Sequence, residues 1–184
     1  MRLRLRHSKG FGNRAVETFE LQHQRDKHGQ RLKHAHHLLH SGMHAQAESI
    51  YIQLLNEGCQ EPTLLLNLAG LHLSCNRSGA AEPLLRQVIE LQPGNGSAYN
   101  NLGMVYSARG DYGLALDAHR QAVHCSPDVE QFRLNLGLAL HEVDEIDASL
   151  QVFLAALERN PCSCDAQLHL GRSYQRLGRP REAI

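Results

Sequence analysis

Apolar residues recur along this chain at the spacing of amphipathic helices, and the helical pattern itself recurs every 34 residues. From His28 onward it predicts units of two antiparallel helices joined by a short turn. The units cover residues 28–61, 62–95, 96–129 and 130–163, with a partial fifth unit at residues 164–184. A period of this length indicates repeats that stack on their neighbours, so we expect an all-α fold, an α-solenoid of helix pairs.

Two positions in each unit hold only small residues, as close packing between helices requires. On the first helix these residues are Ala35, Ala69, Gly103, Gly137 and Gly171, and on the second they are Ala47, Ala81, Ala115, Ser149 and Ala183. Directly before the first position stand Leu68, Leu102, Leu136 and Leu170, which begin an apolar stripe. His34 replaces this leucine in the first unit, and we expect its side chain to be buried and neutral.

The turn inside each unit contains a residue that tolerates left-handed backbone at the end of a helix. These turn residues are Gly42, Asn76, Gly110, Asp144 and Gly178. The second helices are expected to stop near Cys59, Pro93, Pro127 and Pro161, because proline cannot continue a helix.

The unit at residues 96–129 carries Leu102, Gly103, Tyr106, Ala115 and Pro127. These residues resemble the tetratricopeptide repeat family, which has Leu-Gly-x-x-Tyr on the first helix, Ala and an aromatic residue on the second, and a closing Pro. This unit lacks only the aromatic residue, where His119 stands, whereas the unit at residues 28–61 departs most. The resemblance implies a right-handed superhelix whose first helices line a concave surface.

The start of the chain is basic: its first 33 residues hold nine Lys or Arg against three acidic residues, and the remainder holds ten against sixteen. Residues 1–13 contain Gly10 and Gly12 and show no sustained period, so we interpret them as a basic arm without regular structure, with a transit peptide as the alternative. Residues 14–27 predict a leading helix, and residues 28–184 predict the repeat array.

The partial unit at residues 164–184 contains a first helix and only the beginning of a second. Its apolar residues Leu168, Leu170 and Tyr174 would then lack a partner helix, whereas terminal repeats normally end in a polar face. The pattern therefore predicts the N-terminal portion of a longer protein, with a natural end covered by dimerisation as the alternative.

Asparagine recurs two residues before the small position of the first helix, at Asn67, Asn101 and Asn135. An amide both donates and accepts hydrogen bonds, so such a ladder could hold an extended peptide by its main chain. The flanking residues expected to face the same groove or its rim are Leu66, Gly70, Asn100, Met104, Ser107, Leu134, Leu138, His141 and Arg172. The ladder also resembles the repeat arms of O-linked N-acetylglucosamine transferases and similar bacterial enzymes, which implies a substrate-recognition arm as an alternative. A third interpretation is that these amides only join neighbouring helices.

Other chemistry finds little support in the sequence. There is no phosphate loop, nucleophile elbow or zinc-protease motif, so we predict a chain without catalytic residues and without a cofactor. His36 and His40 lie one helical turn apart, and Cys162 and Cys164 flank a single residue, so metal binding is a minor alternative to solvated histidines and reduced thiols. The expected partner is a protein or peptide in the cytoplasm, rather than a nucleic acid, a membrane or a small molecule.

Overall fold

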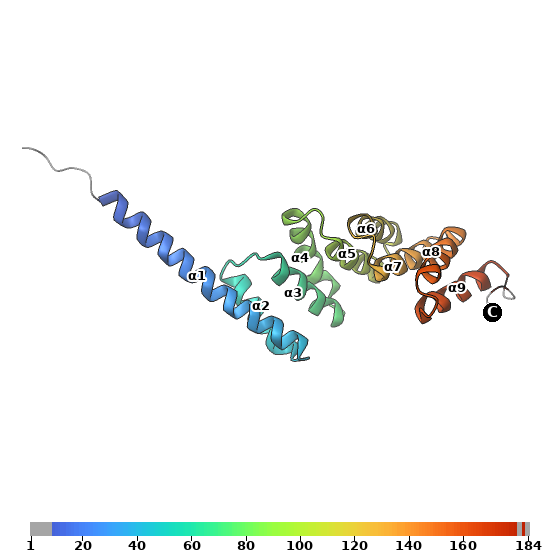
Figure 1. Cartoon of the computed structure of the whole chain (residues 1–184), viewed down its shortest axis with the longest axis horizontal. Helices are drawn as coiled ribbons and strands as arrows, with labels where there is room; N and C mark the ends of the chain where they lie inside the picture. The colour runs from blue at the N-terminus through green and yellow to red at the C-terminus, as the bar shows by residue number, and fades with distance from the viewer. Residues whose placement is uncertain (1–8, 180–181, 183–184) are drawn as a thin grey trace, which may run out of the picture. The chain divides into compact units, whose positions relative to one another are not determined.

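The computed structural model describes residues 9–179 and 182 of the chain, with side chains described from residue 22 onward (Figure 1). Within these residues the secondary structure is entirely helical, which confirms the predicted all-α class. The helices are α1 (Lys9–His40), α2 (His44–Asn56), α3 (Pro62–Ser74), α4 (Ser78–Leu91), α5 (Gly96–Arg109), α6 (Tyr112–Cys125), α7 (Glu130–Glu142), α8 (Ile146–Arg159) and α9 (Cys164–Arg176). None of the described helices is both long and apolar enough to cross a membrane.

The chain divides into two compact units, Met1–Gln60 and Glu61–Ile184. In the first unit α2 packs against α1. Ala35 and Leu38 of α1 and Ala47, Tyr51 and Leu54 of α2 are buried and form its apolar core.

Helix α1 is continuous from Lys9 to His40, which corrects the expected separation between a leading helix at residues 14–27 and the first repeat helix. Residues 9–13, which were expected to be irregular, form its first turns, and residues 1–8 lie outside the described part. No proline interrupts residues 9–40, and a glycine in a helix costs only about 1 kcal/mol, so nothing in this stretch stops the helix from extending.

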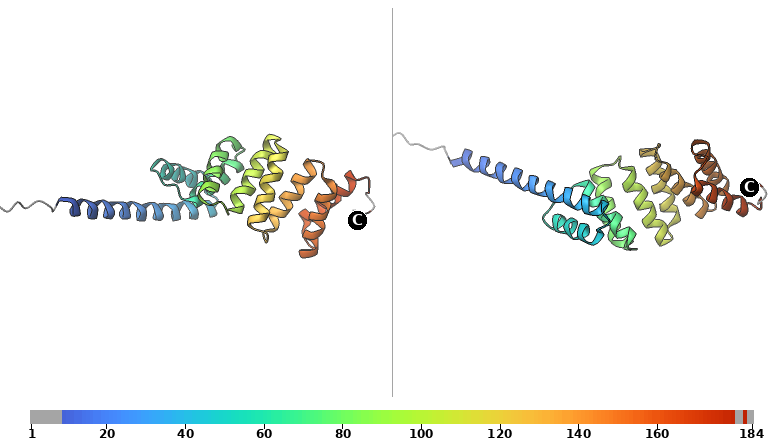
Figure 2. Two further views of the ribbon diagram at one scale, coloured as in Figure 1. Left: turned by 90° about the horizontal axis from the view of Figure 1, so that it is seen from above. Right: turned by 60° about the horizontal axis from the view of Figure 1, so that its bottom comes forward.

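In the second unit the helices form the pairs α3–α4, α5–α6 and α7–α8, followed by α9. The second helix of each pair also packs against the first helix of the next pair, and the first helices contact one another in turn, as the views in Figure 2 show. Helices α3, α5, α7 and α9 begin at residues 62, 96, 130 and 164, the register that the sequence predicts. The expected solenoid of stacked helix pairs is therefore confirmed.

All five turn residues have positive φ, between 56° and 83°. Asn76 and Asp144 are the only non-glycine residues with positive φ among the described residues, and both stand at this turn position. Helices α4, α6 and α8 end two residues before Pro93, Pro127 and Pro161, as predicted. In the first unit the backbone N–H of Cys59 donates to the carbonyl of Leu54 at 2.9 Å, a bond that proline could not make.

The small positions give space to rings on the second helix of the same pair. A Cβ atom on Gly103 would lie 2.6 Å from the imidazole of His119, and one on Gly137 would lie 2.7 Å from the ring of Phe153. On the second helices Ala47, Ala81, Ala115 and Ser149 are buried, and Ala183 lies outside the described residues. The hydroxyl of Ser149 donates to the carbonyl of Gly137 at 2.8 Å, which satisfies it in the core.

His34 is exposed, which corrects the prediction that it would be buried. In the second unit the corresponding Leu102 is buried on α5, which packs against both α4 and α6. Within the first unit α1 packs against α2 alone, so no second helix there covers the side of α1 on which His34 lies.

Candidate functional site

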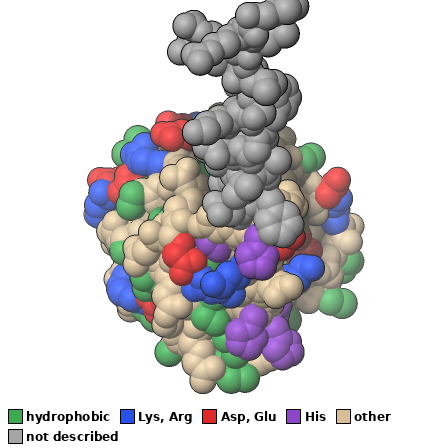
Figure 3. Space-filling view, turned by 90° about the vertical axis from the view of Figure 1, so that its left-hand side faces the viewer, with side chains coloured by type: hydrophobic (Ala, Val, Ile, Leu, Met, Phe, Trp, Pro, Cys, Tyr) green, Lys and Arg blue, Asp and Glu red, His purple; other side chains and the backbone are tan. Residues whose placement is uncertain are grey.

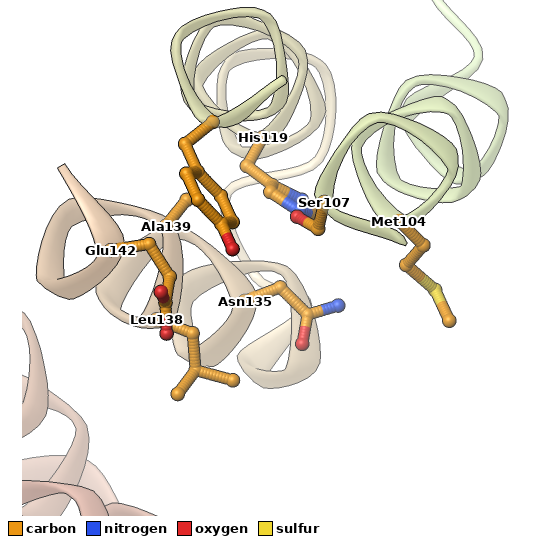
Figure 4. A pocket seen from close by; sticks show the side chains of 8 residues that line it. Met104, Ser107, His119, Asn135, Leu138, Ala139 and Glu142 are labelled. Carbon is orange, nitrogen blue, oxygen red and sulfur yellow. The ribbon is translucent and has the colours of Figure 1, made fainter. Parts of the chain in front are cut away.

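A pocket of about 440 Å³ lies between α5, α6 and α7 in the second unit (Figure 4). Its lining residues are Met104 and Ser107 of α5, Tyr112 and His119 of α6, and Asn135, Leu138, Ala139 and Glu142 of α7. Asn135, Leu138 and Glu142 lie three and four positions apart along α7, so they share one face of the helix. In Figure 4 Met104 points away from the other labelled side chains, and it is 44% exposed at the pocket rim.

Asn135 connects this pocket to the neighbouring helix pair. Its amide Nδ2 donates to Oδ1 of Asn100 at 2.8 Å, and its Oδ1 accepts from Nε2 of Gln131 at 3.1 Å. Asn100 is 6% exposed, so its side chain is used inside the protein rather than displayed in the groove. The third rung of the predicted ladder thus bridges α5 and α7 and also lines the pocket.

The other two rungs lie outside the pocket lining. Asn67 and Asn101 are half-buried on α3 and α5. The side chain of Asn101 has no hydrogen-bond partner among the residues that the structure describes. The three asparagines therefore differ in their surroundings, although they share one register position.

His119 contributes a buried ring to the pocket. The residue is 3% exposed, and its Nδ1 has no hydrogen-bond partner in the structure. Burial lowers the pKa of His119 to about 4, so the ring is neutral at pH 7. The sequence signal for this residue was present, because His119 stands where the repeat pattern has an aromatic side chain.

Sequence reasoning found Met104, Asn135 and Leu138 of the pocket, and placed Ser107 beside them. It did not assign Tyr112 or Glu142 to the site. Glu142 is exposed and stands at the C-terminal end of α7. The repeat register carries no signal for either residue, because their positions hold different residue types in the other repeats, among them Ala108 for Glu142 and Ile146 for Tyr112.

His141 and Arg172 lie outside this pocket, farther along the array on α7 and α9. Arg172 is exposed, while Nε2 of His141 is buried without a hydrogen-bond partner. Burial lowers the pKa of His169 on α9, and the positive charge of Arg172 lowers this pKa further. The ring of His169 stacks on Phe153, with 5.5 Å between ring centroids.

Histidine side chains are visible at several places on the face shown in Figure 3. In the first unit burial lowers the pKa of His36, the neighbouring His40 lowers it further, and the His36 ring lies 6.0 Å from that of Tyr51. The part of the chain that the structure describes has no group of three or more His, Cys, Asp or Glu placed to hold a metal ion. Cys162 and Cys164 are exposed free thiols.

Stacked helix pairs with a pocket between successive pairs define an α-solenoid repeat protein. Models of the tetratricopeptide repeat match residues 62–95, 84–117 and 165–183 of this chain. The first match coincides with one predicted unit. These residues of the chain thus carry tetratricopeptide repeats.

A human relative, tetratricopeptide repeat protein 5, is 28% identical over 116 residues, which are 62% of this chain and 26% of the relative. The chain therefore spans about a quarter of the length of that relative. Among solved structures, MamA from Desulfovibrio magneticus RS-1 has a TM-score of 0.77 at 20% identity, covering 86% of this chain and 89% of that chain. YrrB, described as a repeat protein with an unusual peptide-binding site, has a TM-score of 0.71 at 20% identity, covering 84% and 79%. These two likenesses show a shared fold.

Proposed function

We propose that this chain is a protein-interaction scaffold that holds an extended peptide segment against its first helices, with one peptide side chain in the pocket between α5, α6 and α7. The observation that carries the proposal is the pocket itself, where the Asn135 amide stands beside the apolar Leu138 and the half-exposed Met104. A surface of this kind combines hydrogen bonding to a main chain with contact area for side chains.

The amide of Asn135 gives the site a defined mode of binding. Its two N–H groups and its carbonyl can serve both the internal partners and a ligand, because an amide has more hydrogen-bonding capacity than Asn100 and Gln131 use. Asn101 occupies the same register position one repeat earlier. No described residue hydrogen-bonds to its side-chain amide, so this amide is the second group available to a peptide main chain. YrrB, a protein of the same fold, is itself described as having a peptide-binding site, which supports the proposal.

The experiment compares binding of a library of ten-residue extended peptides to the wild-type chain and to the triple variant Asn67→Ala, Asn101→Ala and Asn135→Ala. We expect the triple variant to lose about tenfold or more in affinity, because two or more hydrogen bonds to the peptide disappear. Gln151→Ala, on the exposed surface of α8, is the matched control and should bind as the wild type does. Equal binding by the triple variant, with an unchanged helical circular dichroism spectrum, would overturn the groove proposal.

No catalytic role is proposed for these residues. The alternative that this region is the recognition arm of a glycosyltransferase stays a prediction, and it requires the same groove with a catalytic domain elsewhere in the protein.

A further inference from the structure

Charge is distributed unevenly around the candidate pocket. Glu142 is its one charged lining residue, and the other lining side chains are neutral or apolar. The carboxylate of Glu142 is exposed and has no ion-pair partner in the described part of the chain. His119 adds no positive charge at pH 7, because burial lowers its pKa to about 4. The pocket therefore presents a single uncompensated negative charge.

The apolar part of the lining suits a long aliphatic stem. Met104 and Leu138 supply flexible and branched apolar surface, and Tyr112, which is 40% exposed, supplies an aromatic ring. Lysine and arginine side chains bury their aliphatic stems on such surface while the charged end remains near water. A cation near an aromatic ring gains further attraction from the ring face.

In the next repeat, the register positions of the pocket residues carry positive charge, opposite to that of Glu142. The positions of Asn135, Leu138 and Glu142 correspond to His169, Arg172 and Arg176 of α9. Arg176 is paired with Asp144, with 3.1 Å between its Nη2 and Oδ1 of that carboxylate. Arg172 is exposed and has no ion-pair partner among the described residues. Glu142 on α7 and Arg172 on α9 are thus exposed charges of opposite sign without an ion pair among the described residues, and Asp165 adds a further exposed acid in the first turn of α9.

We propose that the occupant of this surface is an extended peptide with a lysine or arginine side chain in the pocket beside Glu142 and an acidic side chain beside Arg172. This inference rests on the proposed function and adds the chemistry of the partner to it. Complementary charges at two separated positions fix the register and the direction in which a peptide lies, because the reversed peptide would place like charges together.

A positional-scanning library of ten-residue peptides at low salt tests the proposal, with each position fixed in turn as one amino acid. The wild-type chain should prefer Lys or Arg at one position and Asp or Glu at a second. Glu142→Gln should reduce the preference for the basic residue about threefold, the size of one exposed ion pair. Glu142→Lys should invert it in favour of Asp or Glu, and Arg172→Glu should invert the preference at the second position only.

Glu158→Lys is the matched control, because it makes the same charge change on an exposed residue of α8, away from the pocket. It should leave both preferences unchanged. Binding that falls in the triple asparagine variant without any preference for charge would overturn this inference and leave the groove function standing. A wild-type chain that binds none of the library peptides would overturn both.

Discussion

Two neighbouring helix pairs of the second unit pack different rings, an imidazole and a phenyl, against a glycine at the same position. In the α5–α6 pair the ring of His119 lies against Gly103, and in the α7–α8 pair the ring of Phe153 lies against Gly137. Both rings are buried, and the two contacts are equally close. The phenyl ring belongs to an apolar cluster with Leu134, Ala156 and Ala166, whereas the imidazole carries a nitrogen without a partner. A phenyl ring and an imidazole ring thus both fill this position, and the buried Leu85 fills the corresponding position of α4.

The largest effect on stability should come from a variant that places an imidazole ring in both helix pairs. Phe153→His would remove apolar contact and bury polar nitrogens in a cluster that offers them no partner. We expect the free energy of unfolding to fall by about 2–4 kcal/mol. Urea unfolding followed by circular dichroism measures this. A loss below about 1 kcal/mol would show that the α7–α8 core accepts an imidazole as readily as the α5–α6 core.

A comparable effect should appear on acidification. The pKa of His119 is lowered from 6.5 to about 4 in the folded chain, so between these values the unfolded chain binds a proton that the folded chain does not. The free energy of unfolding therefore falls as pH drops from 6.5 to 4, by up to about 3 kcal/mol for this group.

His119→Phe isolates this contribution from other titrating groups. At pH 7.5 it should raise the free energy of unfolding by about 1–2 kcal/mol, because no buried nitrogen is left unpaired. Its advantage over the wild type should then widen toward pH 4. A constant difference between the two proteins across this pH range would contradict the pKa of His119.

A smaller effect should follow from filling either glycine. A methyl group on Gly103 or Gly137 would overlap the ring beside it, so alanine there should cost about 1–3 kcal/mol. Gly113→Ala on α6 is the control, because a Cβ atom at Gly113 meets nothing within 4 Å. The control should stabilise the protein by about 0.5–1 kcal/mol through helix propensity. Thermal melts of the three variants give the ranking, and equal changes in all three would be inconsistent with the ring contacts.

The smallest effect concerns the asparagine bridge between the two pairs. A double-mutant cycle of Asn100→Ala and Asn135→Ala should give a coupling energy of about 1 kcal/mol, since the hydrogen bond of 2.8 Å is lost only once. Asn101→Ala should change the free energy of unfolding by less than about 0.5 kcal/mol. Denaturant unfolding of the four proteins of the cycle and of Asn101→Ala provides the measurement. No coupling between Asn100 and Asn135 would argue against a structural role for that rung.

The repeat register was predictable because it depends on backbone geometry that few residue types satisfy. Positive φ at Asn76 and Asp144 follows from their tolerance of left-handed backbone, and the helix ends follow from the prolines. The continuity of α1 was not predictable, since nothing local distinguishes two helices in sequence from one long helix. The exposure of His34 depends on how many helices cover α1, which a single repeat pattern does not state.

The site was predictable only in part for a related reason. Register put Asn135 and Leu138 on one face of α7, and both line the pocket. It could not show that Asn135 hydrogen-bonds to Asn100, which stands 35 residues earlier in the chain. That bond depends on the distance between α5 and α7 and on the rotation of each helix about its axis. The same limit separates Asn135 from Asn67 and Asn101, which share its position in the repeat and lie outside the pocket lining.

Helix α1 makes the basic start of the chain a spacer of fixed length. At about 1.5 Å per residue its 32 residues extend over about 48 Å, whereas a flexible segment of the same size would average about 30 Å and vary widely. A probe attached at Lys9 would therefore sit at one set distance from a second probe at His40, and a pair of spectroscopic labels would report a narrow distribution. The positive charges of Arg25, Lys27 and Lys33 are carried on this helix, so a contact with them would not first have to order the backbone.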